Sequence, residues 1–418
     1  MRYLCPKTET TMEEDKTISF ILENAEADGA QLLLSATRYP DVDMMRAAAA
    51  IEARKKIASK IPLWHTYPEL LYPTSLSVEQ CSSQATAEYK IRFVPEGGTI
   101  ADLTGGLGVD CSFMAHRASR CLCVERDPQL YEAAEHNFKV LGLDNISIKN
   151  DDCRGYLETL LGIDEGARTH FDLIYLDPAR RSKDSNRVFS IRECEPDLLQ
   201  ISDTLLKVAD KVLVKLSPMV DIAATLREVP SVREVHILST DNECKELLLL
   251  MGSCGAPLAP EHIPIHAVDI TRGRESHFAF TLNEEKVNPC PIAAPKNYLY
   301  QPCKAILKAG AFKLPCVRFG ISKIAASTHL YTSDMLVEEF PGKSFRIERI
   351  IPFNKEGIRT LSYEYPFINC VALNFPLNTN ALKQRLKVRD GGNLHLFATT
   401  LASGEKVMII SKPLPVTF

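Results

Sequence analysis

The sequence of 418 residues lacks long apolar runs, and its mean hydropathy is close to zero at −0.08. None of its apolar runs approaches the roughly 20 residues that a membrane-spanning helix needs. Its beginning, MRYLCPKTETTMEEDK, is polar and acidic and lacks the apolar core of a signal peptide. We therefore expect a cytoplasmic protein without a membrane partner.

The sequence also lacks CxxC pairs and histidines at zinc-binding spacing, although it contains 13 cysteines. An odd number of scattered cysteines does not fit a disulfide framework. Cys121, Cys123 and Cys370 lie in apolar runs typical of core strands, where cysteine acts as a small apolar residue. We therefore expect reduced thiols, and neither disulfides nor a metal site.

A glycine-rich segment, TIADLTGGLG at residues 99–108, is the most informative feature that is present. A short apolar run ends on a carboxylate, three glycines follow within four positions, and a helical pattern begins after them. Such a strand–loop–helix unit lets the backbone approach a nucleotide-like ligand closely. The G-x-G-x-x-G pattern of dinucleotide sites is missing, because Cys111 stands where its last glycine would be.

The charge beside this loop favours a cationic ligand. Asp102 directly precedes the loop, where it would repel a pyrophosphate and attract the positive charge of S-adenosylmethionine. We therefore predict a methyl donor as the cofactor rather than a dinucleotide. The predicted cofactor contacts in this segment are Asp102, Thr104, Gly105, Gly106 and Gly108.

Strand and helix patterns alternate after residue 99, as in an α/β sheet. Helical stretches between the strands lie near 109–118, 128–141, 153–161 and 193–208. The last two apolar runs are separated only by a tight turn, which favours an antiparallel hairpin. The pattern predicts a Rossmann-like, seven-stranded sheet with strands at 99–103, 121–126, 146–150, 171–176, 211–216, 232–239 and 243–252.

Acidic residues follow the next two predicted strands. Glu125 lies about twenty positions after the glycine loop, where a carboxylate binds the hydroxyls of a ribose; the alternative is a surface carboxylate beside Arg126. Arg126 itself is also among the predicted cofactor contacts. Asp151 ends the third strand, where an acidic residue can meet an adenine amino group. Asp152 fits either this role or that of a helix N-cap.

The motif Asp177-Pro-Ala-Arg-Arg follows the fourth predicted strand. Substrates bind at the carboxyl edge of open parallel sheets, so we expect Asp177 to face the transferable methyl group. Its carboxylate could accept a proton or hydrogen bond from the nucleophile, while Pro178 fixes the loop. Arg180 and Arg181 could hold a phosphate or a carbonyl, or be solvated.

No cysteine stands at 214–220 or beside Asp177, which argues against covalent attack on a pyrimidine. Lys215 lies at the end of the fifth predicted strand, within the segment where such a cysteine would stand. A predicted helix over 77–93 contains Ser82, Ser83 and Lys90, which either approach the cofactor or only pack. The polar run NECKE (242–246) fits a hairpin turn or a functional loop equally well.

Charge is distributed unevenly along the chain. The residues from 290 onwards contain 17 Lys and Arg against 8 Asp and Glu, a net charge of +9, whereas residues 1–289 carry −13. A basic segment attached to an acidic one suggests a polyanionic partner for the basic part. A predicted basic helix, NALKQRLKVRDGG, ending at its glycines, contributes to this charge.

Together these motifs make the chain resemble class I S-adenosylmethionine-dependent methyltransferases with a C-terminal THUMP-like domain, a family found in Bacteroidetes. The resemblance covers most of the chain. The motifs that carry it are IEARKK (51–56), EQCSSQATAEYK (79–90), DLTGGLGVD (102–110), IYLDPARR (174–181), KLSPMVDI (215–222), NECKELL (242–248), KAGAFK (308–313), STHLYTSD (327–334), NFPL (374–377) and LKVRDGGNLHLFATT (386–400).

The resemblance implies an N-terminal helical domain (1–76), a methyltransferase domain (77–279), a ferredoxin-like module (280–322) and a THUMP-like domain (323–418). THUMP domains in RNA-modifying enzymes bind structured tRNA, so the expected activity is methylation of an RNA nucleobase, with tRNA as the expected RNA. The alternatives are a methyltransferase for a small molecule or protein, and a non-catalytic RNA-binding protein. The oligomeric state stays open.

One motif departs from enzymes that methylate exocyclic amines, which usually carry Asp/Asn-Pro-Pro-aromatic at this loop. Ala179 and Arg180 stand in place of the second proline and the aromatic ring. The loss of a stacking surface, worth about 1–3 kcal/mol per base, leaves the methylated atom open.

Overall fold

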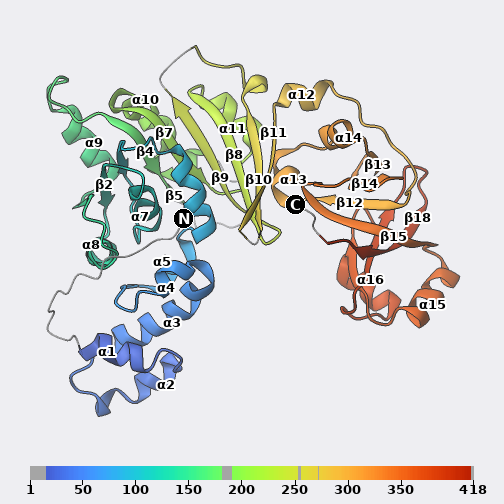
Figure 1. Ribbon diagram of the computed structural model, residues 1–418, viewed down its shortest axis with the longest axis horizontal. Coiled ribbons are helices and arrows are strands. Elements are labelled where there is room, and N and C mark those ends of the chain that lie inside the picture. Colours follow the sequence, from blue (N-terminus) through green and yellow to red (C-terminus); the bar gives the residue numbers. More distant parts are fainter. Residues whose placement is uncertain (1–15, 181–190, 253–255, 272, 416–418) are drawn as a thin grey trace. The chain divides into compact units, whose positions relative to one another are not determined.

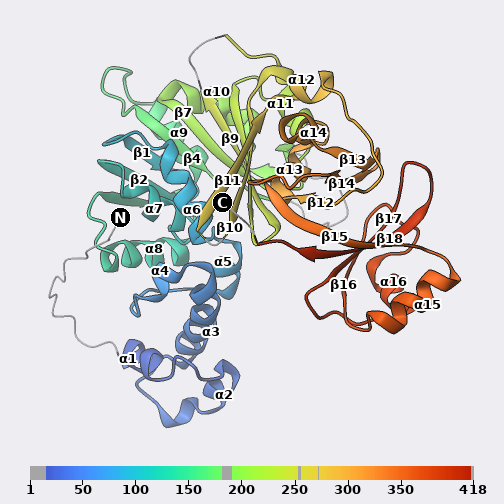
Figure 2. The same ribbon diagram turned by 45° about the vertical axis from the view of Figure 1, so that its right-hand side comes forward.

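A computed structural model describes residues 16–180, 191–252, 256–271 and 273–415 (Figure 1 and Figure 2). The chain divides into two compact units, and neither is one continuous segment. The first comprises Met1–Asn186, Ser190–Lys215 and Met251–Cys254, and the second comprises Arg187–Phe189, Leu216–Leu250 and Gly255–Phe418.

The first unit begins with helices, as expected. The longest, α3, is rich in alanine and begins after Asp43, whose side chain accepts a hydrogen bond from the Arg46 amide at 3.0 Å. Its buried alanines and isoleucines pack against the shorter helices. These elements are α1 (Lys16–Glu23), α2 (Gly29–Leu34), η1 (Ala36–Arg38), α3 (Met44–Lys60) and α4 (Pro62–His65).

The prediction of a single helix over 77–93 is wrong, because the chain forms two helices there. These are α5 (Ser75–Gln80) and α6 (Gln84–Lys90), followed by the turn η2 (Ile91–Phe93). The side chain of Ser83 accepts a hydrogen bond from the Thr86 amide and caps the second helix. The break leaves Ser82 buried between the two helices.

A nine-stranded mixed sheet has the order β11-β10-β8-β9-β7-β4-β1-β2-β3. Parallel pairing joins β1 to β2 and β4, β2 to β3, and β4 to β7, so their carboxyl ends share one edge. All seven predicted strands are confirmed: β1 (Thr99–Asp102), β2 (Arg120–Glu125), β3 (Ile146–Asn150), β4 (Phe171–Leu176), β7 (Ala209–Leu216), β8 (Val232–Thr240) and β9 (Glu243–Gly252).

The sheet has two strands more than expected. β10 (Ile265–Thr271) pairs in parallel with β8, and β11 (Arg274–Phe280) pairs antiparallel with β10. The expected hairpin joins β8 and β9 through Asp241 and Asn242, which both have positive φ as in a type I′ turn. The start of the NECKE run is therefore part of this turn.

Helices connect the parallel strands, and four of them begin with an aspartate that caps free amide groups. These caps are Asp127, Asp152, Asp197 and Asp221. The last capped helix, α11, is not among the predicted helices. The connecting helices are α7 (Val109–Ala115), α8 (Pro128–Val140), α9 (Cys153–Leu161), α10 (Leu198–Val208) and α11 (Ile222–Glu228).

A seven-stranded sheet forms the C-terminal part of the second unit, with the order β13-β14-β12-β15-β18-β17-β16. Its strands are β12 (Tyr298–Pro302), β13 (Ser322–Ala325), β14 (Thr328–Ser333), β15 (Gly342–Pro352), β16 (Asn369–Ala372), β17 (His395–Thr400) and β18 (Lys406–Pro413). The remaining helices of the second unit are η4 (Pro260–His262), α12 (Leu282–Val287), α13 (Lys304–Ala309), α14 (Leu314–Phe319), α15 (Lys355–Glu364) and α16 (Thr379–Leu386).

Helices α15 and α16 lie side by side against this sheet (Figure 1 and Figure 2). The Ser362 hydroxyl of α15 donates to the Leu386 carbonyl of α16 at 2.5 Å. The basic helix does not continue to its glycines as expected, because Lys387 adopts a left-handed conformation and ends it. No helix in the described ranges is both long and apolar enough to cross a membrane.

Candidate functional site

The glycine loop follows β1 and needs glycine at two positions for packing. A Cβ atom on Gly105 would lie 2.4 Å from the Cys123 sulfur, and one on Gly108 would lie 2.5 Å from the ring of Phe138. Gly108 also has a φ of +78°, which disfavours side chains. At Gly106, by contrast, a Cβ atom would meet nothing within 4 Å. The loop is thus packed on one side and open at Gly106.

Glu125 at the end of β2 holds the open part of this loop in place. Its side chain is almost fully buried. One carboxylate oxygen accepts the Gly106 amide at 2.6 Å, and the other accepts the Asp127 amide at 2.8 Å. Each oxygen retains a second lone pair that can accept a ligand hydroxyl.

Asp102 lies beneath the loop with 1% of its surface exposed. Burial raises the pKa of Asp102 from 3.8 to about 8 against the hydrogen bond from Thr104, and the charges of Asp110, Asp177 and Glu125 raise it further. The Thr104 hydroxyl accepts the Asp177 amide at 2.7 Å, which ties this loop to the end of β4. A bound cation would relieve the cost of ionising Asp102.

The structure separates the roles that the sequence left open for Asp151 and Asp152. Asp152 is the N-cap of α9 and accepts the Arg154 and Gly155 amides at 2.8 and 3.1 Å. Asp151 lies at the same sheet edge, half-buried, and accepts only its neighbour's amide among the described bonds. Asp152 therefore has the cap role that the sequence allowed for it, and a ligand contact of Asp151 stays a prediction. The side chain of Arg126 is exposed.

Asp177 and Lys215 form an ion pair across the neighbouring ends of β4 and β7. Lys215 Nζ lies 2.5 Å from Asp177 Oδ2, and the Asp177 side chain is 36% exposed. Burial raises the pKa of the Asp177 carboxyl, and the Lys215 ammonium offsets only part of this effect. The sequence singled out both strand ends but did not predict that they pair.

A buried polar network supports this ion pair from below. Lys90 Nζ donates to Asp110 Oδ1 at 2.8 Å and to the Ser82 hydroxyl at 2.9 Å. Asp110 Oδ2 accepts the hydroxyls of Ser82 and Tyr175 at 2.7 and 2.8 Å. Lys215 Nζ reaches Ser82 at 3.4 Å, which links the network to the site.

Two residues of the helical segment before the loop, Ser82 and Lys90, belong to this network. Lys90 and Ser82 stabilise the ionised form of Asp110, so its pKa is lowered although burial acts in the opposite direction. Ser83 is the cap of α6 rather than a member of the network. Asp110 and Tyr175 are the members that sequence reasoning missed; a buried carboxylate inside the apolar face of α7 was the available signal.

Of the two arginines in the Asp177 loop, the structure describes only the backbone of Arg180. Pro178 is half-buried, and Ala179–Arg180 form the short strand β5, which pairs with β6 (Cys194–Glu195) after the turn η3 (Ile191–Glu193). The Arg180 side chain and all of Arg181 lie outside the described residues. Their roles stay predictions.

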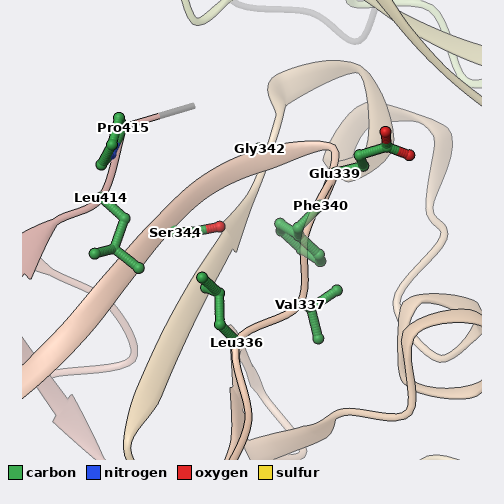
Figure 3. A pocket seen from close by; sticks show the side chains of 8 residues that line it. All are labelled: Leu336, Val337, Glu339, Phe340, Gly342, Ser344, Leu414 and Pro415. Carbon is green, nitrogen blue, oxygen red and sulfur yellow. The ribbon is translucent and has the colours of Figure 1, made fainter. Parts of the chain in front are cut away.

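A small cavity of about 90 Å³ in the second unit is not part of this site (Figure 3). Its lining is mostly apolar and contains none of the residues predicted from the sequence. The lining residues are Leu336, Val337, Glu339, Phe340, Gly342, Ser344, Leu414 and Pro415.

Two family models match the C-terminal part of the chain. A ferredoxin-like domain matches residues 298–341, and a THUMP domain-like family matches residues 342–413. These segments begin later than the 280–322 and 323–418 expected from the sequence. A curated relative, the uncharacterized protein MJ1452 of Methanocaldococcus jannaschii, is 31% identical over 101 residues, which are 24% of this chain and 36% of that protein. This chain thus matches about a third of that relative's length.

The solved structure of a "putative methyltransferase" from Porphyromonas gingivalis W83 matches nearly the whole chain. The two proteins are 35% identical, the match covers 96% of this chain and 98% of that one, and the TM-score is 0.86. Identity and coverage at this level, together with the two domain matches, establish common family membership. The chain belongs to the family of this Porphyromonas gingivalis protein, with ferredoxin-like and THUMP-like domains following a methyltransferase fold.

Proposed function

We propose that the protein is an S-adenosylmethionine-dependent methyltransferase that modifies a nucleobase of RNA, with tRNA as the expected substrate. The observation that carries this proposal is the convergence of four carboxylates around an open glycine loop. Asp102 and Glu125 end β1 and β2, and Asp151 and Asp177 directly follow β3 and β4, at one edge of the parallel strands. The name of the Porphyromonas gingivalis relative supports the same reaction class.

The chemistry of the site fits this cofactor. Glu125 would hold the ribose hydroxyls, Asp151 the adenine amino group, and the buried Asp102 would lie near the positive end of the amino acid part. The open space at Gly106 admits a ligand against the backbone. When bound, the cofactor supplies a methyl group on a positively charged sulfur.

Asp177 would receive the nucleophile of the substrate. Its raised pKa makes it a better proton acceptor than an ordinary carboxylate, and the Lys215 ammonium fixes one of its oxygens at 2.5 Å. The other oxygen can accept a hydrogen bond from a nitrogen or oxygen of the base. Lys215, held in turn by Ser82, would act as a positioning residue.

The THUMP-like part offers a basic surface for RNA. Lys355 and Arg359 of α15 are exposed, as are Arg385, Lys387 and Arg389 at and after the end of α16. None of the five forms an ion pair within the described part of the chain. Exposed cations on α15 and around the end of α16 are suited to phosphate contacts.

Transfer of labelled methyl from S-adenosylmethionine to small RNA tests the proposal. The RNA should come from a strain that lacks this gene, so that its sites are unmodified. We expect wild-type protein and Asp144→Asn, an exposed control, to label RNA, and Asp177→Asn to lose most of the label. Nucleoside digestion would identify the base.

The alternatives give different results in the same assay. Cofactor binding with no label in good RNA would contradict an RNA substrate, and label in protein or small molecules would identify the substrate class instead. Absence of cofactor binding in the folded wild-type protein would contradict the methyltransferase itself.

A further inference from the structure

A cluster of histidines lies on the strands β8, β10 and β11 of the nine-stranded sheet. His236 on β8 and His266 on β10 are direct partners in the parallel register. Glu234 lies two residues before His236 and therefore on the same face of the strand. His277 on β11 stacks on His266, with ring centroids 5.0 Å apart, and completes the row. All four residues belong to the second unit.

The donor atoms of three of these residues converge. His236 Nε2 lies 3.0 Å and His266 Nε2 lies 3.8 Å from Glu234 Oε2, and the three donor atoms all lie within 4.8 Å of one another. Ligands of a tetrahedral zinc ion, with bonds of about 2.0–2.2 Å, lie about 3.4 Å apart. The spacing needs small shifts and a tilt of the two stacked imidazoles, whose planes now differ by 10°.

His266 carries a second, independent sign of a missing ligand. Its Nδ1 is hydrogen-bonded to His277 Nε2 at 2.9 Å, which fixes the ring and directs Nε2 toward Glu234. This Nε2 is buried, and no described group forms a hydrogen bond with it. An outer partner that holds the far nitrogen of a histidine is the usual arrangement around a protein-bound metal.

A single proton on one histidine would not give every donor atom of this cluster a partner. A protonated His236 would complete its contact with Glu234 at 3.0 Å but would leave His266 Nε2 without a partner at 3.8 Å. A divalent cation between the three donors would bind both imidazoles and balance the carboxylate. Two imidazoles and one carboxylate form a ligand set that zinc accepts, with a fourth position for water.

We propose that Glu234, His236 and His266 bind a divalent transition metal of the zinc type, with His277 orienting His266. The proposal is independent of the methyltransferase activity. No metal was expected from the sequence, because the ligands are separated by up to 32 positions and only strand pairing brings them together.

Metal titration of the full-length protein, after removal of bound metal with a chelator, tests the site. Co²⁺ serves as the spectroscopic probe and Zn²⁺ as the competitor. We expect one Co²⁺ per chain with the visible bands of a low-coordinate site, displaced by one Zn²⁺. Glu234→Gln and His266→Gln should each weaken binding at least tenfold.

His136→Gln is the matched control, because His136 is half-buried like His266 and its side chain bonds only to the Glu69 carbonyl among the described contacts. Thermal melting would verify that each variant is folded. Glu234 is half-exposed, so Glu234→Gln should disturb the fold less than His266→Gln does. The proposal is overturned if the wild-type protein binds no Co²⁺. It is equally overturned if both cluster variants bind like the His136→Gln control.

Discussion

At the scale of single residues, the buried Asp102 gives a prediction about pH and stability. Its pKa is about 8 when folded and 3.8 ordinarily, so the folded state holds a proton that the unfolded chain releases. The stability this proton confers is complete below about pH 4 and is lost as pH rises to 8. A cationic ligand favours the ionised form and should therefore bind more tightly as pH rises through this range.

We predict that Asp102→Asn removes this pH dependence. The free energy of unfolding of the wild-type protein should fall relative to that of Asp102→Asn between pH 5 and 8, and the difference should level off above pH 8. Thermal or urea unfolding at several pH values, without cofactor, measures it. Parallel pH curves for the two proteins would mean that Asp102 is ionised throughout.

The ion pair of Lys215 and Asp177 gives a second prediction at this scale. Loss of the ammonium removes the effect that lowers the pKa of Asp177, so Lys215→Gln should raise that pKa further. Activity that needs ionised Asp177 would then begin at higher pH. The pH profile of kcat/KM measures the shift, with Lys211→Gln on the exposed part of β7 as control. A lowered rate with an unshifted profile would restrict Lys215 to a packing role.

At the scale of elements, the glycine loop rests directly on β2. Gly105→Ala would place a methyl group 2.4 Å from the Cys123 sulfur, and such overpacking costs about 1–3 kcal/mol. We predict that Gly105→Ala destabilises the protein and weakens cofactor binding. Adding Cys123→Ala should recover part of both losses, because it removes the sulfur.

Chemical unfolding and cofactor titration of the two single variants and the double variant measure this coupling. Cys153→Ala, another buried cysteine, is the matched control and should not rescue Gly105→Ala. Additive effects of Gly105→Ala and Cys123→Ala would show that the loop relaxes away from β2.

Helices and strands with a clear periodicity of apolar residues were predictable from the sequence. Where they end, and which other elements they contact, was not. The apolar runs of β1, β4 and β7 and the glycine loop follow local patterns. The break between α5 and α6 depends on one capping serine, Ser83, and the end of α16 on the backbone of Lys387. Helix propensity, which is averaged over several residues, does not predict helix ends that depend on a single residue.

The candidate site divides in the same way. The carboxylates at strand ends follow from the parallel topology and were predicted as a group. The contact of Lys215 with Asp177, and that of Lys90 with Asp110, depend on which strands and helices become neighbours. The histidine row is the extreme case, because β10 and β11 were not assigned to the sheet at all.

At the scale of the whole molecule, cofactor and RNA contacts are proposed for different units, and their energetics should separate. Replacing Arg385, Lys387 and Arg389 by Gln removes three exposed cations of the second unit. Each lost phosphate contact lowers the slope of log affinity against log salt by about 0.7–0.9. We predict a slope smaller by about 2–3 for tRNA, with unchanged cofactor affinity.

Fluorescence titration of labelled tRNA at several salt concentrations measures this slope. Lys139→Gln in α8 of the first unit is the control, because it removes one exposed cation outside the THUMP-like part. Its slope should equal that of the wild-type protein. An unchanged slope in the triple variant would place the RNA contacts elsewhere on the chain.

The order of strands in the nine-stranded sheet bears on biosynthesis. β8 precedes β9 along the chain, yet β9 lies between β8 and β7 in the sheet. On the ribosome, β8 therefore joins the sheet only after β9 has been made. A chain that stops before residue 243 would leave the edge of β7 unpaired, and an unpaired edge is a place where chains associate wrongly.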